Sequence, residues 1–189
     1  MEMLEIMRNR RTCRRFDGQA VTLAQAETLM EMARIAPSAA NRQPMRYCAA
    51  VDPAQVKKIH PLVHWAGYTA PLGGPGEGEE PSCYIALLAD TDVKQECAQD
   101  EGIAGAAITY AAEAMGLASC WMGAIERPEI SKILGVPEKW KLLSVIALGY
   151  PAQERVLETS DDVHYWLEGE VLHVPKRPRE KVMFVDRVK

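Results

Sequence analysis

The densest group of residues suited to chemistry is basic and lies near the start of the chain. Its members are Arg8, Arg10, Arg11, Arg14 and Arg15, with Thr12 among them. Guanidinium groups that converge on one anion donate charge-assisted hydrogen bonds worth roughly 1.5–3 kcal/mol each. The spacing therefore favours a small phosphate ester as ligand. A solvated basic turn and a short nucleic-acid contact are the alternatives, and the second is weakened because no aromatic residues interleave with the arginines.

A second polar segment, residues 36–44, lies between an expected helix and an expected strand. It reads Ala-Pro-Ser-Ala-Ala-Asn-Arg-Gln-Pro, so prolines bound a rigid turn. Asn41 and Gln43 each carry an amide that both donates and accepts hydrogen bonds, which suits the edge of a heteroaromatic ring better than a simple anion. A structural turn rich in polar residues is the alternative for this segment.

Missing motifs exclude several other chemistries. The glycine-rich stretch from Gly67 to Pro81 has no G-x-x-x-x-G-K-[ST] pattern, and its glutamates would repel a phosphate. We interpret residues 60–82 as a loop segment that acts as a lid, with an ordinary surface excursion as the alternative. His60 and His64 lack the H-E-x-x-H pattern, so we predict no metal site. The chain also has no G-x-S-x-G nucleophile motif and no G-x-G-x-x-G dinucleotide motif.

Length and composition indicate one globular domain over residues 1–189. Hydrophobic residues make up 48% and charged residues 25%, which is typical of folded proteins. The net charge of −4 disfavours nucleic acid and anionic membranes as partners. The five cysteines form no C-x-x-C pair, and the acidic start of the chain is unlike a signal peptide. We therefore predict reduced thiols and a cytoplasmic location.

Hydrophobic spacing and capping signals predict an α+β domain built on one mixed sheet. Expected helices cover residues 4–10, 22–36, 52–60, 102–115 and 128–134, and expected strands cover residues 46–51, 83–89, 119–125 and 142–148, with a hairpin at 163–174. Thr22 with Gln25 has the form of a capping box. The apolar stretch from Ile103 to Ile125 is rich in alanine and glycine, and Gly116 divides it. A fully buried helix followed by a buried strand is therefore favoured over a membrane span.

Five motifs, in this order, resemble those of the nitroreductase family of FMN-dependent oxidoreductases. Residues 10–16 (R-R-T-C-R-R-F) are similar to its R-R-S-x-R-x-F, residues 36–44 to its A-P-S-x-x-N-x-Q-P, residues 116–123 (G-L-A-S-C-W-M-G) to its G-L-G-S-C-W-x-G, residues 148–151 to its L-G-Y-P, and residues 173–178 (H-V-P-K-R-P) to its closing basic motif. Together the five motifs span most of the chain, so the resemblance is far more specific than any one of them.

The resemblance implies an α+β sandwich, with a central mixed, mainly antiparallel sheet flanked by helices, that forms an intertwined homodimer. It also implies one FMN in each of two clefts at the subunit interface. The positions that match those holding the FMN phosphate and ribityl chain are Arg10, Arg11, Thr12, Arg14, Lys176 and Arg177. Pro37, Ser38 and Asn41 match positions that reach the flavin from the partner subunit. Gly123 and Ala124 match the strand end whose backbone approaches the flavin N5 atom.

The implied reaction needs no catalytic side chain, because the flavin supplies the chemistry. NADH or NADPH would pass a hydride through the flavin to a small electron-poor acceptor, such as a nitroaromatic or a quinone, by a ping-pong mechanism. His64, Trp65 and Tyr68 of the lid segment are candidates for the acceptor pocket. One alternative is a relative that uses FMN for flavin fragmentation or reductive dehalogenation. Another is a flavin-free protein that binds a nucleotide or nucleic acid.

Overall fold

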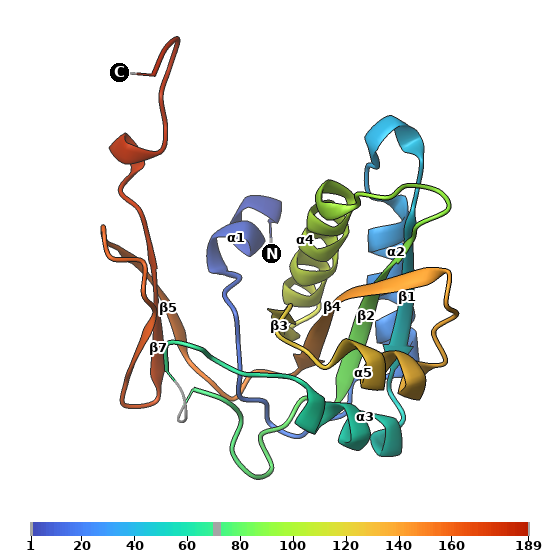
Figure 1. The fold of residues 1–189 in the computed structure, drawn as a ribbon. Helices are drawn as coiled ribbons and strands as arrows, with labels where there is room; N and C mark the ends of the chain where they lie inside the picture. Colours follow the sequence, from blue (N-terminus) through green and yellow to red (C-terminus); the bar gives the residue numbers. More distant parts are fainter. Residues whose placement is uncertain (1, 70–72, 189) are drawn as a thin grey trace.

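The computed structural model describes residues 2–69 and 73–188, and Figure 1 shows their fold. The helices are α1 (Met3–Asn9), α2 (Leu23–Ile35), α3 (Pro53–Ile59), α4 (Ala98–Ala114) and α5 (Arg127–Leu134), with short 3-10 turns at Ala39–Asn41, His60–Leu62 and Arg179–Lys181. The strands are β1 (Met45–Ala50), β2 (Cys83–Asp90), β3 (Ala118–Met122), β4 (Trp140–Gly149), β5 (Arg155–Thr159), β6 (Trp166–Glu168) and β7 (Val171–Lys176). The expected helices and strands are present close to their expected bounds, and β5 is the strand that the sequence did not predict.

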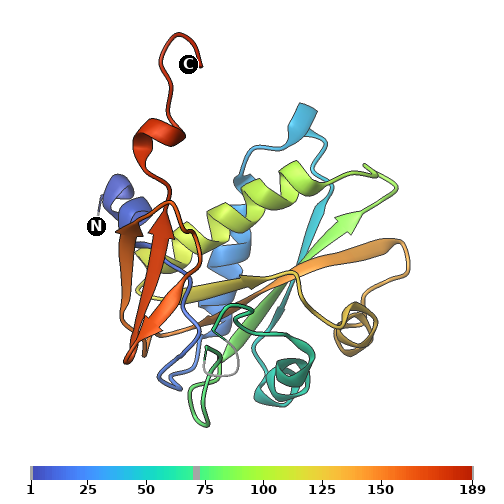
Figure 2. The same ribbon diagram turned by 60° about the vertical axis from the view of Figure 1, so that its left-hand side comes forward.

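The central sheet has the strand order β1-β2-β4-β3, and all its neighbouring strands are antiparallel. A bridge between Thr12 and Ser119 adds a parallel contact at the edge of β3, so the sheet is mixed and mainly antiparallel, as predicted. Figure 1 and Figure 2 show α2 and α4 on one face of the sheet and α3 and α5 on the other. Because both faces are covered, every residue of β2 is buried.

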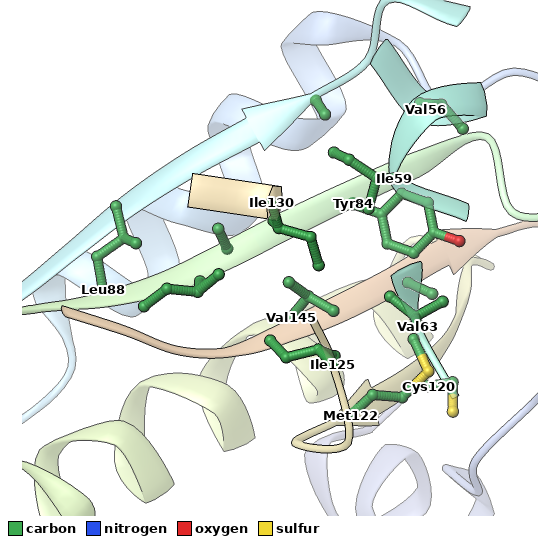
Figure 3. Close-up of a cluster of buried hydrophobic side chains, with 14 residues drawn as sticks. Val56, Ile59, Val63, Tyr84, Leu88, Cys120, Met122, Ile125, Ile130 and Val145 are labelled. Carbon is green, nitrogen blue, oxygen red and sulfur yellow. The ribbon is translucent and has the colours of Figure 1, made fainter. Parts of the chain in front are cut away.

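Successive side chains of β2 enter two separate hydrophobic clusters, since neighbouring residues of a strand point to opposite faces. Tyr84 and Leu88 pack with Ile59 of α3 and Ile130 of α5 in the cluster that Figure 3 shows. Ile85 faces the other way and packs in the cluster under α2 and α4. The central sheet thus joins two core layers and provides a rigid base for the segments at its edge.

Local signals in the sequence set the helix ends. The Thr22 hydroxyl accepts a hydrogen bond from the backbone N–H of Gln25, and the Gln25 side chain accepts one from the backbone N–H of Thr22. The Asp52 carboxylate accepts from the backbone N–H of Ala54 at the start of α3. Gly116 separates α4 from β3 with φ +74°, a conformation that glycine adopts at little cost. A helix followed by a largely buried strand is therefore present as predicted. The prediction that the helix is fully buried is wrong, because Ala104, Ile108 and Ala112 are buried but Ile103 on the other face is 38% exposed.

The small side chains of α4 let this helix lie close to β3. A Cβ atom built on Gly105 would lie 2.3–2.6 Å from three atoms of the Trp121 indole. The indole is also fixed, because its Nε1 donates a hydrogen bond to the Ser144 hydroxyl at 2.6 Å. The close approach therefore depends on the missing side chain at position 105. Across residues 2–69 and 73–188, no helix has both the length and the apolar character needed to cross a bilayer.

Gly105→Ala is expected to lower the free energy of unfolding by about 1–3 kcal/mol, because the Trp121 indole must leave its packed position. Gly102→Ala is the matched control, since it lies in the same helix and its Cβ would meet nothing within 4 Å. Both variants gain the same helix propensity, which is worth about 1 kcal/mol. Urea unfolding of the two variants measures the difference, and equal stabilities would contradict the packing described.

A second sheet, with the strand order β5-β7-β6, lies to one side of α4 (Figure 2). β6 and β7 form the expected hairpin, and β5 pairs with β7 in parallel. The prediction of one sheet is therefore wrong. A parallel pair needs a crossover connection rather than a tight turn, so it leaves no short turn signal between its strands.

The residues that follow β7 leave the body of the molecule as an extended tail (Figure 1). Its exposed apolar side chains are Val182, Met183, Phe184, Val185 and Val188. Within the tail, the one short helical turn of the described residues is Arg179–Lys181. A run of exposed apolar side chains of this kind is typical of a surface that interacts with another molecule.

All five cysteines are free thiols, and Cys48 is the one that is not fully buried. Burial raises the pKa of Cys83 to about 12 and the pKa of Cys120 to about 11. Burial also raises the pKa of Cys13 and of Cys48. The four thiols are therefore protonated at neutral pH.

Candidate functional site

The basic N-terminal segment runs along the edge of β3 in an extended conformation, with Thr12 bridged to Ser119. Alternate side chains of an extended backbone point to opposite sides. Arg10, Thr12 and Arg14 therefore share one side of the segment, and Arg11 faces the other. This alternation decides which of the predicted phosphate-binding residues meet.

Four of the predicted residues, from the two ends of the chain, meet around one cavity of about 340 Å³. They are Thr12, Arg14, Lys176 and Arg177, and the rest of the lining is Val163, Tyr165, Val174 and Pro175. The second sheet produces this meeting, because β7 ends at Lys176 beside the N-terminal segment. The cavity thus joins two basic motifs that are far apart in the sequence.

Arg14 is the buried cation of this cavity. Its residue surface is 8% exposed, and its guanidinium lies over the Tyr165 ring, 4.4 Å from the ring centroid. Its Nε atom is buried and has no hydrogen-bond partner in the part of the chain that the structure describes. A buried donor on a charged group is costly unless an acceptor reaches it. The residues present therefore fit an anion such as the phosphate of FMN.

Arg10 and Arg11 line two further cavities. Arg10 shares a cavity of about 270 Å³ with Thr12, which also lines the cavity at Arg14. Arg11 is 7% exposed and lines a separate cavity with Arg155. Burial and the neighbouring charge of Arg10 lower the pKa of Arg11. The structure thus connects Arg10 and Arg14 through Thr12 and sets Arg11 apart from them.

Pro37, Ser38 and Asn41 lie on the turn after α2, beside the start of α4 (Figure 1). Pro37 and Ser38 line a cavity of about 280 Å³ that has no residue in common with the cavity at Arg14. Within one chain, the structure does not bring these two groups of predicted residues together. Such a separation is what a site shared between two subunits requires.

Gly123 and Ala124 follow β3 and are both exposed. A Cβ atom built on Gly123 would meet nothing within 4 Å, so the strand end is open. The carbonyl of Ala124 accepts a hydrogen bond from the backbone N–H of His64 at 3.0 Å. The His64 ring in turn lies 2.8 Å from the Glu126 carboxylate, measured from Nε2 to Oε1. One predicted pocket residue therefore lies directly beside the predicted strand end.

Trp65 and Tyr68 have different surroundings. Trp65 is partly buried and packs against the core residues around Phe16. Tyr68 is 61% exposed, and its ring contacts that of Tyr165, with 5.0 Å between the centroids. Since Tyr165 also stacks on Arg14, Tyr68 extends the wall of the cavity outward. Residues 70–72 of the predicted lid lie outside the described residues, and its role as a lid stays a prediction.

Comparison with known families decides what kind of chain carries this site. A sequence model of the nitroreductase family matches residues 7–71 and 82–150. The chain belongs to the nitroreductase family. The matched ranges contain the basic N-terminal segment, the turn at 36–44 and the strand end at 123–124, and most of the glycine-rich stretch falls in the gap between them. Lys176 and Arg177 lie beyond the match, so their assignment to the site rests on the shared cavity.

Two curated relatives are similar to this chain over most of its length. One, from Archaeoglobus fulgidus, is provisionally named NADH dehydrogenase/NAD(P)H nitroreductase and is 28% identical over 169 residues, covering 85% of this chain and 92% of the relative. The other, from Bacillus subtilis, is named FMN reductase (NADPH) and is 26% identical over 163 residues, covering 79% of this chain and 66% of the relative.

Solved nitroreductase structures share the fold. A nitroreductase from Bacillus subtilis superposes with a TM-score of 0.72 at 21% identity, covering 98% of this chain and 74% of that one. An NADPH:FMN oxidoreductase from Vibrio harveyi, solved with NAD⁺, superposes with a TM-score of 0.69 at 18% identity, covering 99% and 78%. Both the predicted family and the predicted α+β fold are therefore confirmed.

The nitroreductase fold also places residues at the site that sequence reasoning missed. Tyr165 lies under Arg14, and the side chain of Gln153 accepts a hydrogen bond from the backbone N–H of Arg14 at 3.3 Å. The aromatic pair Tyr165-Trp166 at the start of the hairpin was the available signal for the first. In the described ranges, no three His, Cys, Asp or Glu side chains gather in a way that suits a metal ion.

Proposed function

We propose that this protein is an FMN-dependent oxidoreductase that uses NADH or NADPH to reduce small electron-poor acceptors, such as nitroaromatics or quinones, in two separate half-reactions. The observation that carries the proposal is the cavity where Thr12, Arg14, Lys176 and Arg177 meet, together with the buried Arg14 Nε atom, which has no hydrogen-bond partner among the described residues. Family membership and the names of the relatives support the same cofactor and reductant.

The side chains around the cavity have different roles in the proposed binding of FMN. Arg14, Lys176 and Arg177 bind the phosphate and the ribityl chain with charged hydrogen bonds, and Thr12 adds a neutral donor. Tyr165 fixes the Arg14 guanidinium from below, so little side-chain freedom is lost on binding. Arg10 reaches the same ligand from the neighbouring cavity, and Arg11 supports the segment from its other side.

FMN held by Arg14, Lys176 and Arg177 would supply the redox chemistry, which is hydride acceptance from a nicotinamide and reduction of the acceptor. The chain contributes placement. The open strand end at Gly123 leaves room for a flat ring system. The carbonyls of Gly123 and Ala124 already accept hydrogen bonds from Arg127 and His64, so the polar groups that this backbone would offer to the ring edge are its N–H groups. His64 and Tyr68, both exposed, border the place where the acceptor would bind, and Trp65 holds this segment against the core.

We propose a homodimer in which each site is completed by the turn carrying Pro37, Ser38 and Asn41 from the other subunit. The separation of this turn from the Arg14 cavity within one chain supports this arrangement. The exposed apolar tail after β7 supports it too, as do Ile103 and Trp121, which leave 38% of their surfaces exposed on α4 and β3. A small-molecule acceptor is the remaining partner, and the cytoplasmic location stays a prediction.

The visible absorption spectrum of the purified protein tests the proposed function. We expect a flavin spectrum that bleaches when NADH or NADPH is added without oxygen and that returns when a quinone or nitroaromatic is added. A protein that stays colourless after incubation with FMN would contradict the cofactor. A bound flavin that stays oxidised with both nucleotides would favour a family member with another reaction.

A further inference from the structure

The turn between α2 and β1 is held in an unfavourable backbone conformation. Ala40, Asn41 and Gln43 have φ values of +50°, +53° and +52°, a region that costs energy for residues other than glycine. Several such residues in one short turn persist only when surrounding contacts determine their conformation. The contacts that hold this turn therefore decide where the Asn41 side chain points.

Within the turn, Gln43 Nε2 donates a hydrogen bond to Asn41 Oδ1 at 3.0 Å, and Arg46 donates one to the Gln43 carbonyl at 2.9 Å. The contacts that tie the turn to α4 come from one side chain at the start of that helix. Asp100 Oδ1 accepts a hydrogen bond from the Ser38 hydroxyl at 2.6 Å and a second from the backbone N–H of Ala39 at 3.1 Å. The Ser38 hydroxyl oxygen accepts in turn from the backbone N–H of Gln43 at 2.9 Å. Asp100 thus fixes the start of the turn directly and its end through Ser38.

The other oxygen of this carboxylate is neutralised by Lys94. Its Nζ atom lies 2.6 Å from Asp100 Oδ2, and the side chain of Asp100 is only 1% exposed. Burial would raise the pKa of Asp100, but the hydrogen bonds from Lys94 and Ser38 outweigh it and lower this pKa below its usual value. The Asp100 carboxylate is therefore charged at neutral pH, and its hydrogen bonds go either to the turn or to Lys94.

We propose that Asp100 and Lys94 are positioning residues that hold the turn 38–43 in the conformation in which Asn41 meets the flavin of the other subunit. This inference rests on the proposed function for the flavin contact, whereas the control of the turn stands on the hydrogen bonds alone. Neither residue lines the Arg14 cavity, so neither is a catalytic residue.

Two variants separate the hydrogen bonds from the charge. Asp100→Ala removes the acceptor for Ser38 and Ala39. The double variant Asp100→Asn with Lys94→Met keeps an acceptor oxygen at position 100 and removes both charges, so no unpaired cation is left. Asp92→Asn is the matched control, since Asp92 is an exposed carboxylate before the same helix.

Hydrogen exchange of the flavin-free protein gives the first measurement. In Asp100→Ala we expect the backbone amides of Ala39 and Gln43 to exchange at least about tenfold faster. The Ala39 amide loses its acceptor, and the Gln43 amide loses the hydrogen bond that holds its acceptor, the Ser38 hydroxyl, in place. The double variant should exchange close to the native rate. If the Ala39 and Gln43 amides of Asp100→Ala exchange at the native rate while α4 stays protected, Asp100 does not hold the turn. This conclusion is independent of what the protein binds.

The affinity for FMN, measured by quenching of flavin fluorescence, gives the second measurement. If the competent turn is populated only a tenth of the time in Asp100→Ala, the dissociation constant rises by about tenfold, and the double variant restores it. Faster exchange with native affinity would overturn the link between Asp100 and the flavin while leaving the proposed function intact. Loss of FMN binding in the Asp92→Asn control as well would overturn the specific role of Asp100.

Discussion

Replacing Arg14 and Lys176 together by alanine is expected to weaken FMN binding by at least about a hundredfold, because two charge-assisted hydrogen bonds to the phosphate contribute about 1.5–3 kcal/mol each. The fold should be retained, since neither guanidinium nor ammonium fills a hydrophobic cluster. Removal of Arg14 also removes a buried donor that has no partner in the described chain. Equilibrium titration of the flavin-free variant with FMN measures the effect.

The charge-matched control is Lys57→Ala with Lys58→Ala. Both lysines are exposed in the last turn of α3, and neither lines the Arg14 cavity. The control loses the same two positive charges, so it measures how much of the effect comes from the overall field of the protein. If the variant that lacks Arg14 and Lys176 binds FMN with native-like affinity, the assignment of the phosphate site to this cavity is wrong.

Serine in place of Val182, Met183, Phe184 and Val185 is expected to convert the proposed homodimer into monomers and to lose FMN at the same time. Each apolar side chain that another subunit covers contributes about 1.5–3 kcal/mol when fully buried, and the loss of four exceeds the stability of most dimers at micromolar concentration. A monomer also lacks the second subunit's turn at 38–41, which the proposed site requires.

Light scattering measures the mass, which should fall to the 21.0 kDa of one chain. Asp186→Asn with Arg187→Gln is the control, because it alters the same tail without changing its apolar residues or its net charge. A dimer that persists in the serine variant would show that the tail does not carry the interface. A monomer that keeps FMN would contradict the shared site.

The parts of the fold that were predictable are those with local causes. Thr22, Gln25 and Asp52 satisfy the first backbone N–H groups of their own helices, so the signal lies within a few residues of its effect. β5 was missed because its partner β7 is the second strand of the following hairpin, and because its residues are half-buried or exposed, with no buried apolar face. Parallel pairing of this kind depends on tertiary contacts.

The candidate site was also predictable only where its signal is local in the sequence. The spacing of the arginines in the sequence predicted an anion site. The direction of each guanidinium, however, follows from the bridge between Thr12 and Ser119, because this bridge fixes the extended backbone. Arg11 faces away from Arg14 for that reason. Tyr165 and Gln153 escaped detection because they reach Arg14 only through the second sheet and its connection to β4.

The buried thiols affect how quickly electrophilic acceptors would inactivate the protein during the proposed reaction. Quinones are electrophiles as well as electron acceptors, and they alkylate sulfur only as the thiolate. With Cys13, Cys83 and Cys120 buried and their pKa values raised, arylation has to wait for the core to open. Arylation of these three thiols by the proposed quinone acceptors should then follow the rate of local unfolding and become faster in destabilised variants such as Gly105→Ala, whereas the half-buried Cys48 is partly accessible in the folded protein.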